Sequence, residues 1–193
     1  MTLTKLTALV LAAGGSTRCP GGKLTRRYQG RPLLSWLLEK LERSELIERV
    51  HLVCGFQAEQ VEVLAQDFPK VTTVLNEDWS KGLSTSLKRG IESLPEDIPG
   101  VLVCLGDTPF FSDLTLQRVV GEVGESTSVI LPCFEGKMGH PKYFPSWLFP
   151  ELLELSGDEG ARKVLRRFQD RTRVVQVDDP GILKDFDTPQ DFL

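Results

Sequence analysis

Residues 9–24, LVLAAGGSTRCPGGKL, combine a short apolar run with four glycines and two cations, Arg18 and Lys23. Glycine lets backbone N–H groups approach oxygen anions closely, and cationic side chains balance the charge of those anions. The stretch therefore predicts a phosphate-binding loop. Because Arg18 and Lys23 are spread along the loop, they could span a triphosphate rather than a single phosphate.

Two common phosphate loops are excluded by the residues themselves. A Walker loop needs GxxxxGK followed by Ser or Thr, but Thr17 stands at its first glycine and Leu24 follows Lys23. The dinucleotide fingerprint GxGxxG is also missing. A surface loop rich in turn residues is the alternative, although the position directly after an apolar run argues against it.

A second candidate for chemistry is Asp107, which ends the apolar run VLVCLGD at residues 101–107. Mg²⁺ binds hard oxygen ligands, typically one or two carboxylates together with substrate phosphates. Asp107 could instead simply cap the turn that follows it. The two histidines, His51 and His140, belong to no convincing Ser-His-Asp or Cys-His set, so no protein nucleophile is expected. His51 lies in a strand-like run and is expected to be structural.

The elements that would position these residues follow from the hydrophobic pattern. Short apolar runs alternate with segments of helical spacing, which is typical of βαβ units and a mainly parallel sheet. Strands are expected at 7–13, 49–54, 71–75, 101–107, 128–134 and 174–177, and helices at 32–43 and along stripes that begin at Val61, Leu87, Leu116 and Ala161. Ligands bind at the carboxyl ends of strands in such sheets, so the loops after Ala13, Asp107 and Cys133 are expected to carry the chemistry.

Length and composition predict one domain, residues 1–193, with 40% hydrophobic and 26% charged residues. A net charge of −4 gives no overall attraction for nucleic acid. No apolar run approaches the ~20 residues of a membrane span, so we expect a cytoplasmic protein without nucleic-acid or membrane partners. The four cysteines are far apart and form no CxxC pair. We expect Cys54 and Cys104 to be buried, reduced thiols and Cys19 to be a packing residue.

The pattern LAAGGSTR followed by CPGGK closely resembles the signature LAAGxSxR-x4-K of nucleotidyltransferases of the molybdenum-cofactor cytidylyltransferase and guanylyltransferase group. Further segments are similar to motifs of this family, in family order: NEDWSKGLSTSLKRG (76–90), LGDTPF (105–110), GHP (139–141), GDEGAR (157–162) and DFDTPQDF (185–192). One departure is Cys19-Pro20, where the family commonly has Met-Gly. Proline lacks an N–H group, so one backbone donor of the loop is lost or moved.

The resemblance implies a single Rossmann-like (GT-A type) α/β fold, a three-layer sandwich with a mostly parallel sheet. It implies a Mg²⁺-dependent enzyme that transfers CMP from CTP to the phosphate of molybdopterin and releases pyrophosphate, with a molybdoenzyme as a possible partner. Ala13 favours CTP because LAAG is similar to cytidylyl enzymes and LAGG to guanylyl ones. The alternatives are GTP, another acceptor such as a sugar or alcohol phosphate, or a non-catalytic carrier of the nucleotide or pterin.

The same resemblance implies roles for individual residues. Catalysis falls to Arg18, Lys23 and Asp107, and metal binding to Asp107 and Asp187, with Asp185 as the alternate to Asp187. Asp187-Thr188-Pro189 also fits a helix N-cap followed by proline. His140, Pro141 and Arg162 are implied to bind the acceptor, although the basic run around Arg162 also fits a solvated helix face. The nucleotide falls to Leu11, Ala12, Ala13, Gly14, Gly15, Ser16, Arg18, Lys23, Gly82, Ser86 and Asp107.

Overall fold

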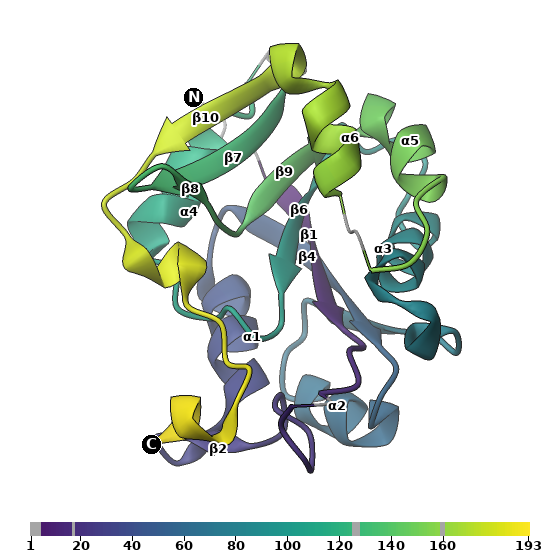
Figure 1. The fold of residues 1–193 in the computed structure, drawn as a ribbon, viewed down its shortest axis with the longest axis vertical. Helices are drawn as coiled ribbons and strands as arrows, with labels where there is room; N and C mark the ends of the chain where they lie inside the picture. The colour runs from purple at the N-terminus through teal and green to yellow at the C-terminus, as the bar shows by residue number, and fades with distance from the viewer. Residues whose placement is uncertain (1–4, 17, 125–127, 159–160) are drawn as a thin grey trace.

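The computed structural model describes residues 5–16, 18–124, 128–158 and 161–193. They form an α/β sandwich in which helices cover both faces of a twisted sheet (Figure 1). This eight-stranded sheet has the order β10-β7-β9-β6-β1-β4-β5, with β8 paired to β7. Its strands are β1 (Leu6–Ala12), β4 (Ile47–Cys54), β5 (Val71–Leu75), β6 (Gly100–Leu105), β7 (Val129–Phe134), β8 (Lys137–Met138), β9 (Lys142–Pro145) and β10 (Thr172–Gln176). The expected three-layer α/β sandwich is confirmed.

The sheet is mixed but mostly parallel, as predicted. Strand β1 pairs in parallel with β4 and β6, β4 with β5, and β7 with β10. Strand β9 runs antiparallel to both β6 and β7, and β8 runs antiparallel to β7. The sequence pattern predicts neither β8 nor β9. Both strands are short, and β9 begins with a lysine and ends with a proline, so neither has the apolar pattern of a central strand.

Alternation along the strands divides the core between the two faces. In β1, Ala8 and Val10 belong to one cluster and Leu9 and Leu11 to the other, so this central strand is buried on both sides. The first cluster is covered by α1 (Leu33–Arg43), α2 (Ala58–Ala65) and α4 (Asp113–Gly121), and the second by α3 (Leu83–Glu92), α5 (Phe149–Leu153) and α6 (Arg162–Arg167). All four cysteines are buried, as predicted for Cys54 and Cys104, and none forms a disulfide. Among the described residues no helix is long and apolar enough to cross a membrane.

Short elements join these helices and strands. A separate hairpin, β2 (Arg27–Tyr28) with β3 (Arg31–Pro32), precedes α1, so the helix begins one residue later than predicted. Pro32 stands at the N-cap with ψ 139°, outside the helical region. The five 3₁₀ segments are η1 (Trp79–Lys81), η2 (Ser146–Leu148), η3 (Gln169–Arg171), η4 (Pro180–Leu183) and η5 (Pro189–Phe192).

After β10 the chain crosses the carboxyl ends of the parallel strands, as the yellow segment of Figure 1 shows. The carbonyl of Ile182 accepts a hydrogen bond from the backbone N–H of His140 at 3.0 Å. The N–H of Phe186 donates to the carbonyl of Asp107 at 3.1 Å. This C-terminal segment, residues 178–193, therefore brings its aspartates to the loop that follows β6.

Candidate active site

The glycine loop after β1 is held in a compact shape by its own polar groups. The Oγ of Ser16 accepts a hydrogen bond from the backbone N–H of Lys23 at 3.2 Å, which closes the loop on itself. Gly21 and Gly22 both have left-handed φ angles, 89° and 88°. A Cβ on Gly22 would collide with the side chain of Gln57, which donates to the carbonyl of Gly21 at 3.0 Å. Glycine is favoured at Gly22 by its left-handed conformation, and a Cβ there would also displace the end of the Gln57 side chain.

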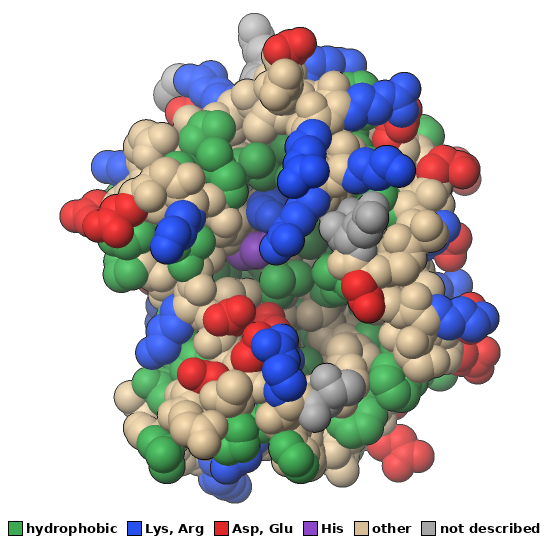
Figure 2. Space-filling model, in the orientation of Figure 1, with side chains coloured by type: hydrophobic (Ala, Val, Ile, Leu, Met, Phe, Trp, Pro, Cys, Tyr) green, Lys and Arg blue, Asp and Glu red, His purple; other side chains and the backbone are tan. Residues whose placement is uncertain are grey.

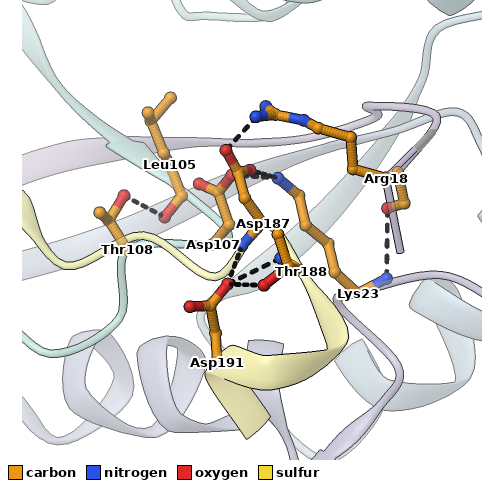
Figure 3. A network of polar contacts seen from close by, with 9 residues as sticks. Arg18, Lys23, Leu105, Asp107, Thr108, Asp187, Thr188 and Asp191 are labelled. Carbon is orange, nitrogen blue, oxygen red and sulfur yellow. Dashed lines mark hydrogen bonds and ion pairs between the residues drawn. The ribbon is translucent and has the colours of Figure 1, made fainter.

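Four charged side chains meet beside this loop (Figure 3). The ammonium of Lys23 lies 2.5 Å from Asp107 Oδ2 and 2.9 Å from Asp187 Oδ1, and Arg18 lies 2.7 Å from Asp187 Oδ2. Burial lowers the pKa of Lys23, but the nearby carboxylates of Asp107 and Asp187 outweigh it and raise the pKa overall. Lys23 is thus a firmly charged cation between two carboxylates.

The position of Asp187 is fixed by the turn that follows it. The Oδ2 atom of Asp191 accepts hydrogen bonds from the N–H groups of Asp187 and Thr188, at 3.0 and 2.7 Å, and from the Thr188 hydroxyl. Thr188, rather than Asp187, stands at the N-cap of η5, with Pro189 as the first helical residue. The carboxylate of Asp187 is therefore not used as a cap and points to Lys23 and Arg18.

The acidic side chains fit a divalent metal held jointly with substrate. The carboxylates of Asp107 and Asp187 converge on one position of positive charge, the Lys23 ammonium, and both offer the hard oxygen atoms that Mg²⁺ and Mn²⁺ prefer. Asp185 lies nearby, where burial and then the charges of Asp187 and Asp107 raise its pKa. In the described ranges no cluster of three or more His, Cys, Asp or Glu could hold a metal alone. Phosphate oxygens and water would complete the coordination.

Every residue predicted for nucleotide binding lines one cavity of about 540 Å³. These residues are Leu11, Ala12, Ala13, Gly14, Gly15, Ser16, Arg18, Lys23, Gly82, Ser86 and Asp107. Asp185 and Asp187 line the same cavity. Figure 2 shows the hollowed face, with basic side chains along one rim and acidic side chains gathered on the opposite side. The cavity opens at the carboxyl ends of β1 and β6, where the sequence placed the chemistry.

Trp79 is a cavity residue for which the sequence predicts no individual role. Its ring packs so closely on the glycine loop that a Cβ on Gly15 would lie 2.8 Å from it. The same side chain contacts Gly55, where a Cβ would lie 2.6 Å from the Trp79 Cβ, and Phe56, with ring centroids 5.5 Å apart. Trp79 lies in the motif at residues 76–90, and this position is the sequence feature that could have indicated its place in the site. Leu24, Ser80, Leu83, Leu105 and Asp158 were also missed.

The start of α3 forms the far wall of the cavity. Gly82 has φ 115°, and a Cβ there would lie within 2.8 Å of Gly157 and Asp158. The side chain of Asp158 accepts a hydrogen bond from the N–H of Leu83 at 3.1 Å, which joins the GDEGAR segment to the helix. Ser86, one turn further, is 4% exposed and accepts a hydrogen bond from Asn76 at 3.0 Å.

A second cavity, of about 590 Å³, lies beside the first and shares Leu105 and Asp185 with it. His140 and Arg162, for which an acceptor role is predicted, line it together with Lys142 and Arg166, for which the sequence predicts no role. Its apolar wall is formed by Leu131, Met138, Leu165, Val174, Ile182 and Leu183. Pro141, by contrast, is buried behind a cis peptide bond to His140 and lines neither of these two cavities.

Burial changes the protonation of the polar groups in the second cavity. It lowers the pKa of Lys142 to about 8, with a further contribution from the charge of Arg162. Burial, and then the charge of Lys142, lower the pKa of His140 to about 3, so this imidazole is neutral at pH 7. The Nδ1 atom of His140 lies 3.4 Å from the carbonyl oxygen of Val103. The cavity is therefore cationic through its lysine and arginines, and not through its histidine.

The rest of the basic run on and after α6 is largely engaged elsewhere. Arg167 pairs with Glu151 at 2.7 Å and Arg173 with Glu122 at 2.8 Å. The guanidinium of Arg171 lies over the ring of Trp147. Much of this run is thus a solvated surface with its own ion pairs, and the members that line the second cavity are Arg162 and Arg166.

Comparisons with known proteins agree with this geometry. Residues 8–174 match the model of the MobA-like NTP transferase domain. The purine catabolism protein PucB of Bacillus subtilis is 32% identical over 97% of this chain and 94% of its own length. The bifunctional protein GlmU of Cutibacterium acnes is 41% identical over 58% of this chain, and the chain spans about a quarter (27%) of that relative's length.

A solved structure supports the same assignment. The crystal structure of Rv0371c from Mycobacterium tuberculosis H37Rv superposes with a TM-score of 0.83 at 28% identity, covering 98% of this chain and 96% of that one. A complex of Rv0371c with manganese superposes with a TM-score of 0.77. The family model covers most of the chain, and the α/β architecture is shared. We conclude that this chain belongs to the MobA-like NTP transferase family of nucleotidyltransferases.

Proposed function

We propose that residues 1–193 act as one Mg²⁺-dependent cytidylyltransferase domain, which transfers CMP from CTP to the phosphate of molybdopterin and releases pyrophosphate. The observation that carries the proposal is the meeting of Arg18 and Lys23 with Asp107 and Asp187 at the edge of a glycine-lined cavity. Two cations suit a triphosphate, and two carboxylates suit a metal that this triphosphate also binds. The product would pass to a molybdoenzyme partner in the cytoplasm.

The reaction needs positioning and charge stabilisation rather than a protein nucleophile. A phosphate oxygen of the acceptor attacks the α-phosphorus of CTP, the bond from this phosphorus to the bridging oxygen breaks, and pyrophosphate leaves. Arg18 and Lys23 stabilise the negative charge of the triphosphate and of the departing pyrophosphate. The Ser16 hydrogen bond to the Lys23 backbone keeps the loop closed around these groups.

Asp107 and Asp187 would hold the metal, which when bound neutralises phosphate charge and polarises the α-phosphoryl group. Their own task is to fix two oxygen ligands in place. Asp107 is fixed by the loop after β6, and Asp187 by the turn bonded to Asp191. Asp185 lies beside them, where burial and then the charges of Asp187 and Asp107 raise its pKa.

The preference for CTP is supported by Ala13, which lines the cavity and is 1% exposed. Its methyl group packs toward Gly55, so the space beyond the loop is limited on this side. A methyl in place of a hydrogen disfavours a larger purine. Discrimination by such a group is worth about 1–3 kcal/mol, and the competing reading is an enzyme that uses GTP.

The acceptor is proposed to occupy the second cavity, because that cavity adjoins the first and has the character of an anion site with an apolar wall. Arg162, Arg166 and Lys142 would bind a phosphate, and leucine and isoleucine side chains would pack on a planar ring system. Molybdopterin has both parts. A sugar or alcohol phosphate would use the cations but not the apolar wall.

The proposal is tested by supplying molybdopterin with CTP, GTP, UTP or ATP and Mg²⁺, and by identifying the dinucleotide and pyrophosphate formed. We expect the cytosine dinucleotide from the native protein and none from Asp107→Ala. Asp97→Ala is the matched control, because Asp97 is exposed and precedes β6 at the end opposite Asp107. A guanine product would correct the nucleotide. Product from sugar phosphate alone would correct the acceptor, and acceptor binding without turnover in the native protein would indicate a carrier.

A further inference from the structure

Lys40 reaches from α1 to the loop that carries Asp107. Its ammonium donates hydrogen bonds to the backbone carbonyls of Pro109, at 2.9 Å, and Phe111. It also lies 4.4 Å from the centre of the Phe111 ring. Pro109 and Phe111 are both buried, so their carbonyls need partners within the protein. Among the described residues, Lys40 is the one that donates hydrogen bonds to these two carbonyls.

The loop between β6 and α4 is fastened at both ends. At its start, Gly106 donates to the carbonyl of Leu11 at 3.0 Å and Thr108 to that of Leu105 at 3.1 Å. At its end, the N–H of Ser112 donates to Asp179 at 2.6 Å. Between these points the backbone from Asp107 to Phe111 has few hydrogen bonds of its own. The two bonds from Lys40 fall in this interval.

A lysine is an unusual choice for such a place. Burial lowers the pKa of Lys40, while the charges of Asp113 and Asp179 raise it and that of Arg43 lowers it. Desolvating an ammonium is costly, and a neutral donor could bond a carbonyl at lower cost. The position of the Asp107 carboxylate depends on the path of the loop, which the cation holds at two carbonyls within four residues of it.

We propose that Lys40 is a positioning residue that holds the Asp107 loop so that its carboxylate can share a divalent metal with Asp187. This inference rests on the proposed metal site. Residues that orient metal ligands typically cost about 10–100-fold in metal affinity when they are removed. Lys40→Met should therefore weaken metal use at Asp107 while leaving the metal-independent contacts of the nucleotide cavity unchanged.

Lys70 offers a matched control. It is partly buried like Lys40, and its ammonium also donates to a backbone carbonyl beside α1, that of Ser44 at 2.8 Å. This bond is made at Ser44, the C-cap of α1, and involves neither Pro109 nor Phe111. Lys70→Met thus removes the same kind of interaction from the same helix without touching the loop.

The experiment measures CTP binding by calorimetry with Mn²⁺ and with EDTA, and takes the ratio of the two affinities as the metal gain. GTP is used in a parallel series, so that an error in the base is not mistaken for a missing metal site. Lys40→Met is expected to lower the metal gain about 10-fold. The affinity of Lys40→Met for the nucleotide in EDTA should be unchanged. Lys40→Arg should keep the metal gain within about 2-fold of the native value. Lys70→Met should have the metal gain of the native protein. Urea unfolding checks that each variant is folded. If Lys40→Met does not fold, the metal gain of Lys40→Arg is compared with that of the native protein instead.

The two proposals fail in different ways. A native protein with no metal gain for either nucleotide, or a gain that survives in Asp107→Asn, overturns the metal site and the role of Lys40 with it. A gain that is lost in Asp107→Asn but kept in Lys40→Met overturns the role of Lys40 alone. An equal loss of gain in Lys70→Met and Lys40→Met would also overturn it, since the effect would then be one of general stability. A Lys40→Met that does not fold, with Lys40→Arg losing the gain although folded, would contradict it as well.

Discussion

The ammonium nitrogen of Lys23 lies 2.9 Å from Oδ1 of Asp187, although 164 positions separate these residues in the chain. The contact joins the glycine loop to the C-terminal segment, and Arg18 holds the second oxygen of the same carboxylate. The C-terminal segment is fastened independently to the Asp107 loop through Phe186. Three parts of the chain therefore close on one point, and substitutions there are expected to affect catalysis more than folding.

Replacing Lys23 with methionine should lower the rate of pyrophosphate release at least about 100-fold, because the cation proposed to stabilise the triphosphate charge would be lost. The rate is measured with CTP, Mg²⁺ and the acceptor. Lys5→Met serves as the control, since Lys5 is exposed and precedes β1 at the end opposite the cavity. A rate within 2-fold of the native protein for Lys23→Met would contradict its assignment.

Gly82→Ala should disturb the wall of the nucleotide cavity. The left-handed φ and the contacts with Gly157 and Asp158 leave no room for a methyl group, so we expect a loss of about 1–3 kcal/mol in the free energy of unfolding. Gly121→Ala is the contrast, because a Cβ there meets nothing within 4 Å and replacing a helical glycine stabilises by up to about 1 kcal/mol. Urea denaturation measures both. Equal effects of the two substitutions would refute the packing argument.

Ala13→Gly should shift the nucleotide preference toward GTP. Removing the methyl enlarges the cavity beside the glycine loop, and the ratio of kcat/KM for CTP to that for GTP should fall about 10-fold. Steady-state kinetics with both nucleotides give the ratio. An unchanged ratio would mean that base selection depends on other cavity residues, such as Ser86.

The affinity for the acceptor should depend on pH through Lys142. Its pKa in the folded protein, about 8, is below the ordinary value of 10.5, so the side chain is charged below pH 8 and loses its charge as the pH rises through 8. The groups that face it are Arg162, which stays charged, and His140, which is already neutral. Bound phosphate would favour the charged form.

The KM for the acceptor should therefore rise between pH 7 and 9, while the KM for CTP changes less. Lys142→Arg should remove this rise, because a guanidinium keeps its charge over the whole range. A native profile that stays flat from pH 7 to 9, or a rise that persists in Lys142→Arg, would contradict the role of this lysine.

Much of the fold could be predicted because many of its helices and strands follow from local hydrophobic patterns. The apolar run of β1 and the stripes of α1 and α4 are properties of neighbouring residues, and the predicted spans differ from the observed ones by one to a few residues. Strand β9 could not be found this way, since its four residues form a strand only because β6 and β7 flank them. Its antiparallel direction depends on the whole topology.

The candidate site also contains residues that the sequence could predict and residues that depend on tertiary packing. Residues within recognisable motifs, such as Ser16, Lys23 and Asp107, were predicted to lie together and do line one cavity. Trp79 was missed because its contact with Gly15 depends on how two loops pack, although it belongs to a quoted motif. Lys142 follows the GHP motif by one residue, and the burial that lowers its pKa has no sequence signal.

The central claim is that Asp107 and Asp187 together hold a divalent metal against the triphosphate of CTP. It is tested most directly by calorimetric titration of CTP with Mg²⁺ and with EDTA, for the native protein, Asp187→Asn and Asp185→Asn. We predict that Mg²⁺ strengthens CTP binding at least about 10-fold in the native protein and in Asp185→Asn, and that this gain is lost in Asp187→Asn. A gain that survives in Asp187→Asn and disappears in Asp185→Asn would show that Asp185, and not Asp187, is the metal ligand. No gain in the native protein would contradict the claim itself.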